Sequence, residues 1–297
     1  MISCKHVTKT YRGTTALNRL SCNIHENTIT GLIGRNAAGK TTLLKILTGM
    51  IKESSGEVEV FSKHPFNNLF VSANSILVDD QMSFANSISL YELLQQAGRF
   101  YKNWDMDLAL RLFDYFSFQP NAIHEGLSKG RKSTFNMIIG LASRCPLTIF
   151  DEPTTGMDAV VRNDFYRALL KDYIAHPRTI IISSHHLDEM EHLLEHVLVI
   201  KKGKELLHIP MEDLKEYAIG LEGKTAVLKE WLGDQPVLTK RTASDYAYIA
   251  VKNDFDTEQL EQVKQQGVKV SPVSANDVCM YLTKGQKGGI DDVFRQR

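Results

Sequence analysis

The chain lacks an excess of charge of either sign. Its 297 residues carry 35 lysines and arginines against 35 aspartates and glutamates, so the formal net charge is zero. Nucleic-acid-binding domains and proteins that adhere to anionic membranes are usually basic, and this balance gives no general attraction to either partner. We therefore expect no nucleic acid among the partners of this protein.

Long apolar runs and paired cysteines are missing as well. The longest apolar candidate, residues 137–150, is broken by Arg144 and Pro146, and a membrane-spanning helix needs about 20 apolar residues. Basic residues interrupt the apolar core that an N-terminal signal peptide would require. The four cysteines form no Cys-x-x-Cys pair, which favours reduced thiols over disulfides or a zinc site. We expect a cytoplasmic protein, with any membrane span supplied by another chain.

The most specific pattern present is a glycine, four residues, and then Gly-Lys-Thr, which begins at Gly34. The β-rich residues 28–33 before it predict a buried strand, and apolar residues at helical spacing after it predict a helix. A strand, a tight loop and a helix N-terminus point successive backbone N–H groups at one place, where the helix dipole adds positive potential. The pattern predicts a phosphate-binding loop, and its alternative is a plain glycine turn.

The residues predicted to bind phosphate in this loop are Gly34, Arg35, Asn36, Ala37, Ala38, Gly39, Lys40, Thr41 and Thr42. Lys40 is predicted to pair with the β- and γ-phosphates of a nucleotide, and the Thr41 hydroxyl to ligate Mg²⁺. Ala37 stands where many such loops carry glycine. Because a positive φ is costly for a residue with a Cβ, we expect a negative φ at Ala37 unless the loop is strained.

Two acidic residues end an apolar, β-rich segment in the middle of the chain. Residues 147–150 lead directly into Asp151 and Glu152. Asp151 is predicted to hold Mg²⁺, directly or through water, and Glu152 to polarise an attacking water. Taken alone, such a pair is more often a solvated loop. Combined with a phosphate-binding loop earlier in the chain, it favours a site of nucleotide hydrolysis.

Strand and helix patterns alternate over the first two thirds of the chain. Short β-like segments occupy residues 2–32, and a helical insert over residues 83–143 precedes further strands at 147–150 and 179–182. Residues 197–204 resemble a β-hairpin. Alternation of this kind predicts an α/β fold with a largely parallel sheet.

Beyond about residue 215 the motifs cease. Apolar segments at residues 226–228, 246–251 and 268–270, with a helix over 257–266, predict a small α+β appendix. We therefore expect a nucleotide-hydrolysing domain over residues 1–214, which contains the helical insert, and a C-terminal accessory domain over residues 215–297.

Further motifs make residues 2–210 resemble the nucleotide-binding subunit of an ABC transporter. Leu127–Arg131 is similar to the family signature Leu-Ser-Gly-Gly-Gln, which opens a helix and binds the γ-phosphate held by a second subunit. The chain departs from it with Lys129 in place of glycine and Arg131 in place of glutamine, and retains Ser128 and Gly130. Lys129 is predicted either to contact the partner's γ-phosphate or to extend into solvent.

The resemblance assigns four more positions, namely Tyr11, Gln81, residues 156–158 and His185. It implies that Tyr11 stacks on adenine, although plain strand packing is the alternative, and that Gln81 senses Mg²⁺ and faces the membrane partner. Residues 156–158 resemble the loop that crosses the dimer interface. His185 matches the histidine that steadies the γ-phosphate. A serine hydrolase is disfavoured because no Gly-x-Ser-x-Gly elbow is present.

The resemblance thus implies a P-loop ABC-type fold, with antiparallel β and helical subdomains, that binds ATP and Mg²⁺ and hydrolyses ATP as a homodimer or heterodimer. It implies a separate permease and a location on the cytoplasmic face of the cell membrane. Bacterial exporters of drugs or peptides have a similar organisation. The alternatives are a structural or catalytically weak ATP-binding subunit, which the altered signature favours, and an ABC ATPase outside transport.

Overall fold

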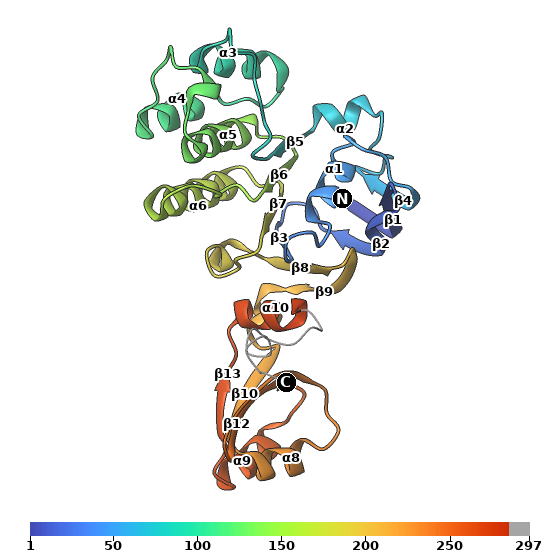
Figure 1. The fold of residues 1–297 in the computed structure, drawn as a ribbon. Helices are drawn as coiled ribbons and strands as arrows, with labels where there is room; N and C mark the ends of the chain where they lie inside the picture. Colours follow the sequence, from blue (N-terminus) through green and yellow to red (C-terminus); the bar gives the residue numbers. More distant parts are fainter. Residues whose placement is uncertain (285–297) are drawn as a thin grey trace, which may run out of the picture. The chain divides into compact units, whose positions relative to one another are not determined.

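The computed structural model describes residues 1–284, and the chain divides into two compact units, Met1–His208 and Ile209–Arg297 (Figure 1). The division falls earlier than the predicted boundary after residue 214. The reason is that helix α7 (Met211–Lys215) contacts helix α10 (Ala275–Thr283) of the second unit. Among the described residues, no helix has the length and apolar character needed to cross a membrane.

A six-stranded sheet forms the centre of the first unit, with strand order β5-β6-β7-β3-β8-β9. The pairs from β5 to β8 are parallel. Every residue of β3, β5, β6 and β7 is buried, as expected for strands covered on both faces. The bounds are Ile29–Ile33 for β3, Ser75–Val78 for β5, Leu147–Asp151 for β6, Thr179–Ser184 for β7, His196–Lys201 for β8 and Lys204–Pro210 for β9.

The antiparallel β subdomain is confirmed. Strands β1 (Ile2–Tyr11), β2 (Thr14–Ile24) and β4 (Ser55–Val60) form a sheet in the order β2-β1-β4. Its apolar face shares one hydrophobic core with helix α1 (Lys40–Leu47). This packing holds the helix that follows the phosphate-binding loop between two sheets.

The predicted helices of the insert are also confirmed. They are α3 (Leu90–Phe100), α4 (Met106–Tyr115) and α5 (Lys129–Ser143), which contact one another (Figure 1). Residues 133–143 of α5 are all buried, because this helix also contacts β5, β6 and helix α6 (Ala159–Ala175). A short helix, α2 (Leu69–Ala73), precedes β5.

The second unit is a four-stranded antiparallel sheet with the order β11-β12-β10-β13. Helix α8 (Thr225–Leu232) follows β10 and helix α9 (Thr257–Gln265) follows β12. The resulting β-α-β-β-α-β order is the ferredoxin-like, split βαβ topology. The strands are β10 (Ala218–Lys224), β11 (Val237–Ala243), β12 (Tyr246–Lys252) and β13 (Lys269–Pro272).

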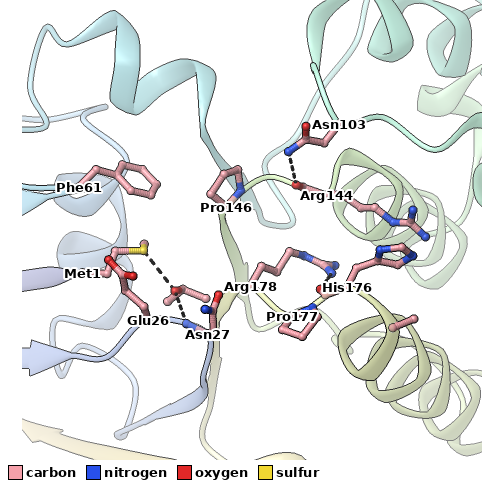
Figure 2. Close-up of a pocket in the computed structure, with 12 residues that line it drawn as sticks. Met1, Glu26, Asn27, Phe61, Asn103, Arg144, Pro146, His176, Pro177 and Arg178 are labelled. Atoms are coloured by element: carbon pink, nitrogen blue, oxygen red, sulfur yellow. Dashed lines mark hydrogen bonds between the residues drawn. The ribbon is translucent and has the colours of Figure 1, made fainter.

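A pocket of about 760 Å³ lies at the amino ends of the parallel strands of the first unit (Figure 2). Beside it, the guanidinium of Arg178 lies 2.8 Å from an Asp172 carboxylate oxygen, and each side chain is only 5% exposed. Arg144 also pairs with Asp172, at 3.0 Å. Burial lowers the pKa of Arg178, and the charge of Asp172 opposes that shift. No predicted nucleotide-site residue lines this pocket, so we place the functional site at the opposite ends of the strands.

Asp172→Ala should destabilise the first unit by about 3–5 kcal/mol, because it leaves the buried guanidinium of Arg178 without its carboxylate partner, whereas Arg144 keeps Asp105 at 2.9 Å. Chemical denaturation measures this change. The control is Glu57→Ala, which removes a solvent-exposed partner of Lys5 and should cost at most about 1 kcal/mol. Equal effects of the two substitutions would show that the buried network does not stabilise the fold.

Candidate nucleotide-binding site

The phosphate-binding loop joins the end of β3 to the start of α1, as the sequence predicts. Eight of its nine residues, Arg35 to Thr42, line a pocket of about 240 Å³ together with Glu152. The remaining residue, Gly34, lies against β8, where a Cβ would come within 2.7 Å of the Ile200 carbonyl oxygen. Gly39 has a φ of 108°, and its Cβ would lie 2.6 Å from the Ala16 carbonyl oxygen.

The expected negative φ at Ala37 is wrong. Ala37 has a φ of 63°, in the left-handed region, so the loop keeps the conformation that glycine adopts more easily. A left-handed conformation brings the Cβ too close to the following carbonyl oxygen, at a cost of about 1–2 kcal/mol. The loop closes through a hydrogen bond from the Ala38 N–H to the Arg35 carbonyl oxygen at 3.0 Å. The strained alternative named for this position is therefore the one adopted.

Lys40, Glu152 and His185 form one hydrogen-bonded group. The Lys40 ammonium, only 7% exposed, lies 2.9 Å from Glu152 Oε1 and donates to the Gly34 carbonyl oxygen at 2.7 Å. The other oxygen of Glu152 lies 2.9 Å from His185 Nδ1. A single carboxylate thus joins the lysine of the loop to the histidine that follows β7. The sequence predicted all three as site residues but gave no contact between them.

The backbone of Glu152 is held in an unusual conformation. Its φ of 49° lies in the left-handed region, directly after the end of β6. Its N–H donates to Ser183 Oγ at 3.0 Å. The Ser183 hydroxyl in turn donates a short hydrogen bond to Asp151 Oδ1. Strained backbone of this kind is concentrated at functional sites, where the surrounding contacts enforce it.

The three residues predicted to serve Mg²⁺ have different surroundings. Thr41 lines the phosphate pocket, and Asp151 is buried at the end of β6, one residue before Glu152. Their hydroxyl and carboxylate oxygens are ligands of the type that Mg²⁺ prefers. Gln81 does not line that pocket. Its side-chain oxygen accepts a hydrogen bond from Lys45 at 3.2 Å.

The signature residues form a second pocket, of about 190 Å³. Ser128 is the N-cap of α5, and it lines this pocket with Gly130 and residues 156–158. A Cβ on Gly130 would lie 2.3 Å from the Gly156 carbonyl oxygen, so only glycine permits this approach. Ser133 adds a hydrogen bond to the Thr155 carbonyl oxygen at 3.0 Å. The signature and the loop predicted to cross a dimer interface are thus packed together.

The two cations of the altered signature have different contacts. The Lys129 ammonium is largely exposed and lies 3.7 Å from an Asp80 carboxylate oxygen. The Arg131 guanidinium lies over the Phe118 ring, 4.3 Å from its centroid, and donates to the Ser117 carbonyl oxygen at 3.0 Å. Arg131 therefore binds the chain just beyond the end of α4, a role that the sequence pattern did not reveal.

Tyr11 lies at the end of β1 and is 43% exposed. It does not line the phosphate pocket, and the Lys9 ammonium lies 5.1 Å from its ring centroid. The phosphate pocket and the signature pocket have no lining residue in common. Within the described chain, the two predicted halves of a nucleotide site are therefore separate.

Comparisons with known proteins identify the class. The pattern of the ABC transporter family matches residues 17–155. The bacitracin transport ATP-binding protein BcrA of Bacillus licheniformis is 31% identical, over 99% of this chain and 89% of that protein. The ABC transporter ATP-binding protein YtrB of Bacillus subtilis (strain 168) is 28% identical, over 75% of this chain and 76% of that protein.

Solved structures agree on the fold. The dimeric ATP-binding cassette MJ0796, bound to ADP and Pi, has a TM-score of 0.63 at 20% identity, over 71% of this chain and 99% of that one. An ATP binding subunit of an ABC transporter has a TM-score of 0.66 at 18% identity, over 72% of this chain and 92% of that one. The chain belongs to the ABC transporter family. It is an ATP-binding subunit with ATPase activity.

Ala37→Gly should stabilise the first unit by up to about 1 kcal/mol. The substitution removes a left-handed alanine that costs about 1–2 kcal/mol, and it adds about 0.5–1 kcal/mol of backbone entropy loss on folding. Chemical denaturation without nucleotide measures the difference. Ala38→Gly is the control, because Ala38 has no positive φ and so has no left-handed strain to relieve. This variant should only lose stability. A loss of stability in Ala37→Gly as large as in the control would contradict the assigned strain.

Proposed function

We propose that this subunit drives a separate transmembrane permease, through a dimer that closes on ATP and opens after hydrolysis. The observation that carries the proposal is the separation of the phosphate pocket from the signature pocket within one chain. Two chains that face each other would bring the phosphate loop of one against the signature of the other. The γ-phosphate would then act as a removable link between two states. The second chain would be an identical or a related ATPase subunit.

In this proposal the residues around the phosphate pocket divide the chemistry. Lys40 and the loop amides hold the phosphates, and Thr41, Asp151 and Gln81 serve Mg²⁺. Glu152 activates the attacking water and His185 steadies the γ-phosphate. Support comes from the Lys40–Glu152 distance of 2.9 Å, because an entering phosphate competes with that carboxylate for the same ammonium. ATP binding would therefore release Glu152 toward the water it activates.

Across the proposed dimer, Ser128, Lys129 and Gly130 of the facing chain contact the γ-phosphate, and Tyr11 stacks on adenine. Ser128 is the N-cap of α5, and the positive end of that helix dipole would face the anion. A rival function is an ATP-binding subunit with weak chemistry. The altered signature favours it, since Lys129 pairs with Asp80 within its own chain.

For the transported substrate we propose a drug or a peptide, moved outward. The relative aligned over 99% of this chain is named for bacitracin transport, and bacitracin is the first compound to test. The subunit would then act at the cytoplasmic face of the membrane through its permease.

Glu152→Gln should bind ATP and accumulate as an ATP-bound dimer in size-exclusion chromatography with Mg²⁺. Its hydrolysis rate should fall at least ~100-fold, at the lower end of what a general base contributes. Glu189→Gln is the matched control, because Glu189 is similarly exposed and pairs with Arg162 at 2.9 Å. The control should turn over ATP normally. Normal turnover in Glu152→Gln would remove this residue from catalysis and count against the proposed mechanism.

Lys129→Glu should leave ATP binding by the monomer unchanged, because the phosphate loop of the same chain is intact. It should weaken ATP-driven dimerisation, since a charge reversal places repulsion beside the partner's γ-phosphate, worth roughly 4 kcal/mol at ~4 Å and a dielectric of ~20 before desolvation. Lys129→Gly should be much milder. Analytical ultracentrifugation with Mg-ATP measures the dimer fraction of wild type, Lys129→Glu and Lys129→Gly. A glutamate variant that dimerises like wild type would exclude Lys129 from the nucleotide.

A further inference from the structure

Two buried polar side chains, His124 and Asn136, connect the loop that carries Gln81 (residues 79–84, the Gln81 loop) to the signature. They are 2% and 1% exposed, respectively. His124 begins a 3-10 turn (His124–Gly126) just before the signature, and Asn136 lies within α5. The Asn136 side-chain nitrogen donates to the Asp79 carbonyl oxygen at 3.2 Å. Its side-chain oxygen lies 2.8 Å from His124 Nε2.

These contacts fix the direction of both hydrogen bonds. The Asp79 carbonyl can only accept, so the amide NH₂ of Asn136 faces it and the amide oxygen faces His124. His124 Nε2 must therefore carry a proton. Burial lowers the pKa of His124, which favours the neutral ring. Its Nδ1 is buried with no hydrogen-bond partner among the described residues. Donation thus runs from His124 through Asn136 to the backbone of Asp79.

A ring contact joins the same two parts of the chain. Phe84, three residues after Gln81, meets His124 edge-on with the ring centroids 4.9 Å apart. On the other side, the Leu127 N–H donates to the His124 carbonyl oxygen at 3.1 Å, directly before Ser128 begins α5. The segment that holds Gln81 therefore contacts α5 through Asp79 and contacts the turn that leads into the signature through Phe84.

The choice of asparagine is informative. Most buried positions of α5 around it are apolar, and a buried amide is costly unless its hydrogen bonds are made. Asn136 accepts one hydrogen bond and donates another, and a buried polar contact of this kind favours one arrangement of the parts that it joins. Here those parts are the Gln81 loop and the signature.

We propose that Asn136 and His124 are positioning residues, which transmit movement of the Gln81 loop on nucleotide binding to Ser128 and Gly130. The inference rests on the proposed roles of Gln81 and the signature in a shared site. Neither side chain lines the phosphate pocket or the signature pocket. They act on the signature through packing and hydrogen bonds alone.

The test compares Asn136→Leu, His124→Leu and His124→Gln in the full chain. The leucines remove the hydrogen bonds, whereas the glutamine amide can place an N–H where His124 Nε2 donates. Ser143→Ala is the control, because Ser143 is fully buried in the same helix and its hydroxyl donates to Gly140 within that helix. Fluorescent-ATP binding, kcat, the unfolding midpoint and hydrogen exchange over residues 124–132 are measured for each variant.

We expect the leucine variants to bind nucleotide within ~2-fold of wild type while kcat falls at least ~10-fold, the change that corresponds to about 1.4 kcal/mol. Nucleotide should slow hydrogen exchange over residues 124–132 in wild type, His124→Gln and Ser143→Ala, and this response should be lost in the leucine variants. Unchanged kcat and exchange in Asn136→Leu would overturn the proposal. So would a loss of kcat that merely parallels lost stability and lost nucleotide binding. If wild type shows the exchange response without ATP-driven dimerisation, the coupling stands and the proposed function fails.

Discussion

A buried lysine ammonium at the end of a parallel sheet requires a negative partner, and this constraint organises the site. Lys40 is held there by the loop between β3 and α1, where most of its surface is removed from water. An unpaired ammonium in such a place would be unstable. Glu152 supplies the negative charge without ligand, and it reaches Lys40 from the end of β6 with a left-handed backbone. In the proposed cycle a phosphate takes over that partner position.

The same sheet explains why the phosphate-binding residues gather in one place while the signature lies in another. Strands β3, β6 and β7 are parallel neighbours, so the loop, Glu152 and His185 meet at one edge. The signature is instead placed by α5 and by the close approach of Gly130 to Gly156. A polar pair, His124 and Asn136, attaches that arrangement to the Gln81 loop. Each chain thus offers two separate surfaces, which suits the proposed dimer.

Local patterns made much of this predictable. The loop, the acidic pair and the helix starts depend on short stretches, such as Ser128 before α5, whose residues dictate the backbone. At Ala37 the sequence favoured a negative φ and left a strained loop as the alternative. The strained conformation is the one adopted, because contacts of the folded loop override the preference of a single residue. Nothing in the sequence indicated that Arg131 would pack on Phe118. The ferredoxin-like strand order could not be predicted either, because it depends on pairings between distant segments. Strand β10 (Ala218–Lys224) also contains glycines and charged residues, so its sequence lacks a strong strand pattern.

The most direct test of the account is a cross-link between two chains. One chain carries Asn36→Cys in the phosphate loop and a differently tagged chain carries Lys129→Cys in the signature, both with Glu152→Gln. The four native cysteines are buried, so a short bifunctional thiol reagent should report the engineered pair. The account predicts a cross-link between the two tagged chains with Mg-ATP and none with Mg-ADP. A yield that does not depend on the nucleotide, or no cross-link in an ATP-bound sample, would contradict a site shared between two chains.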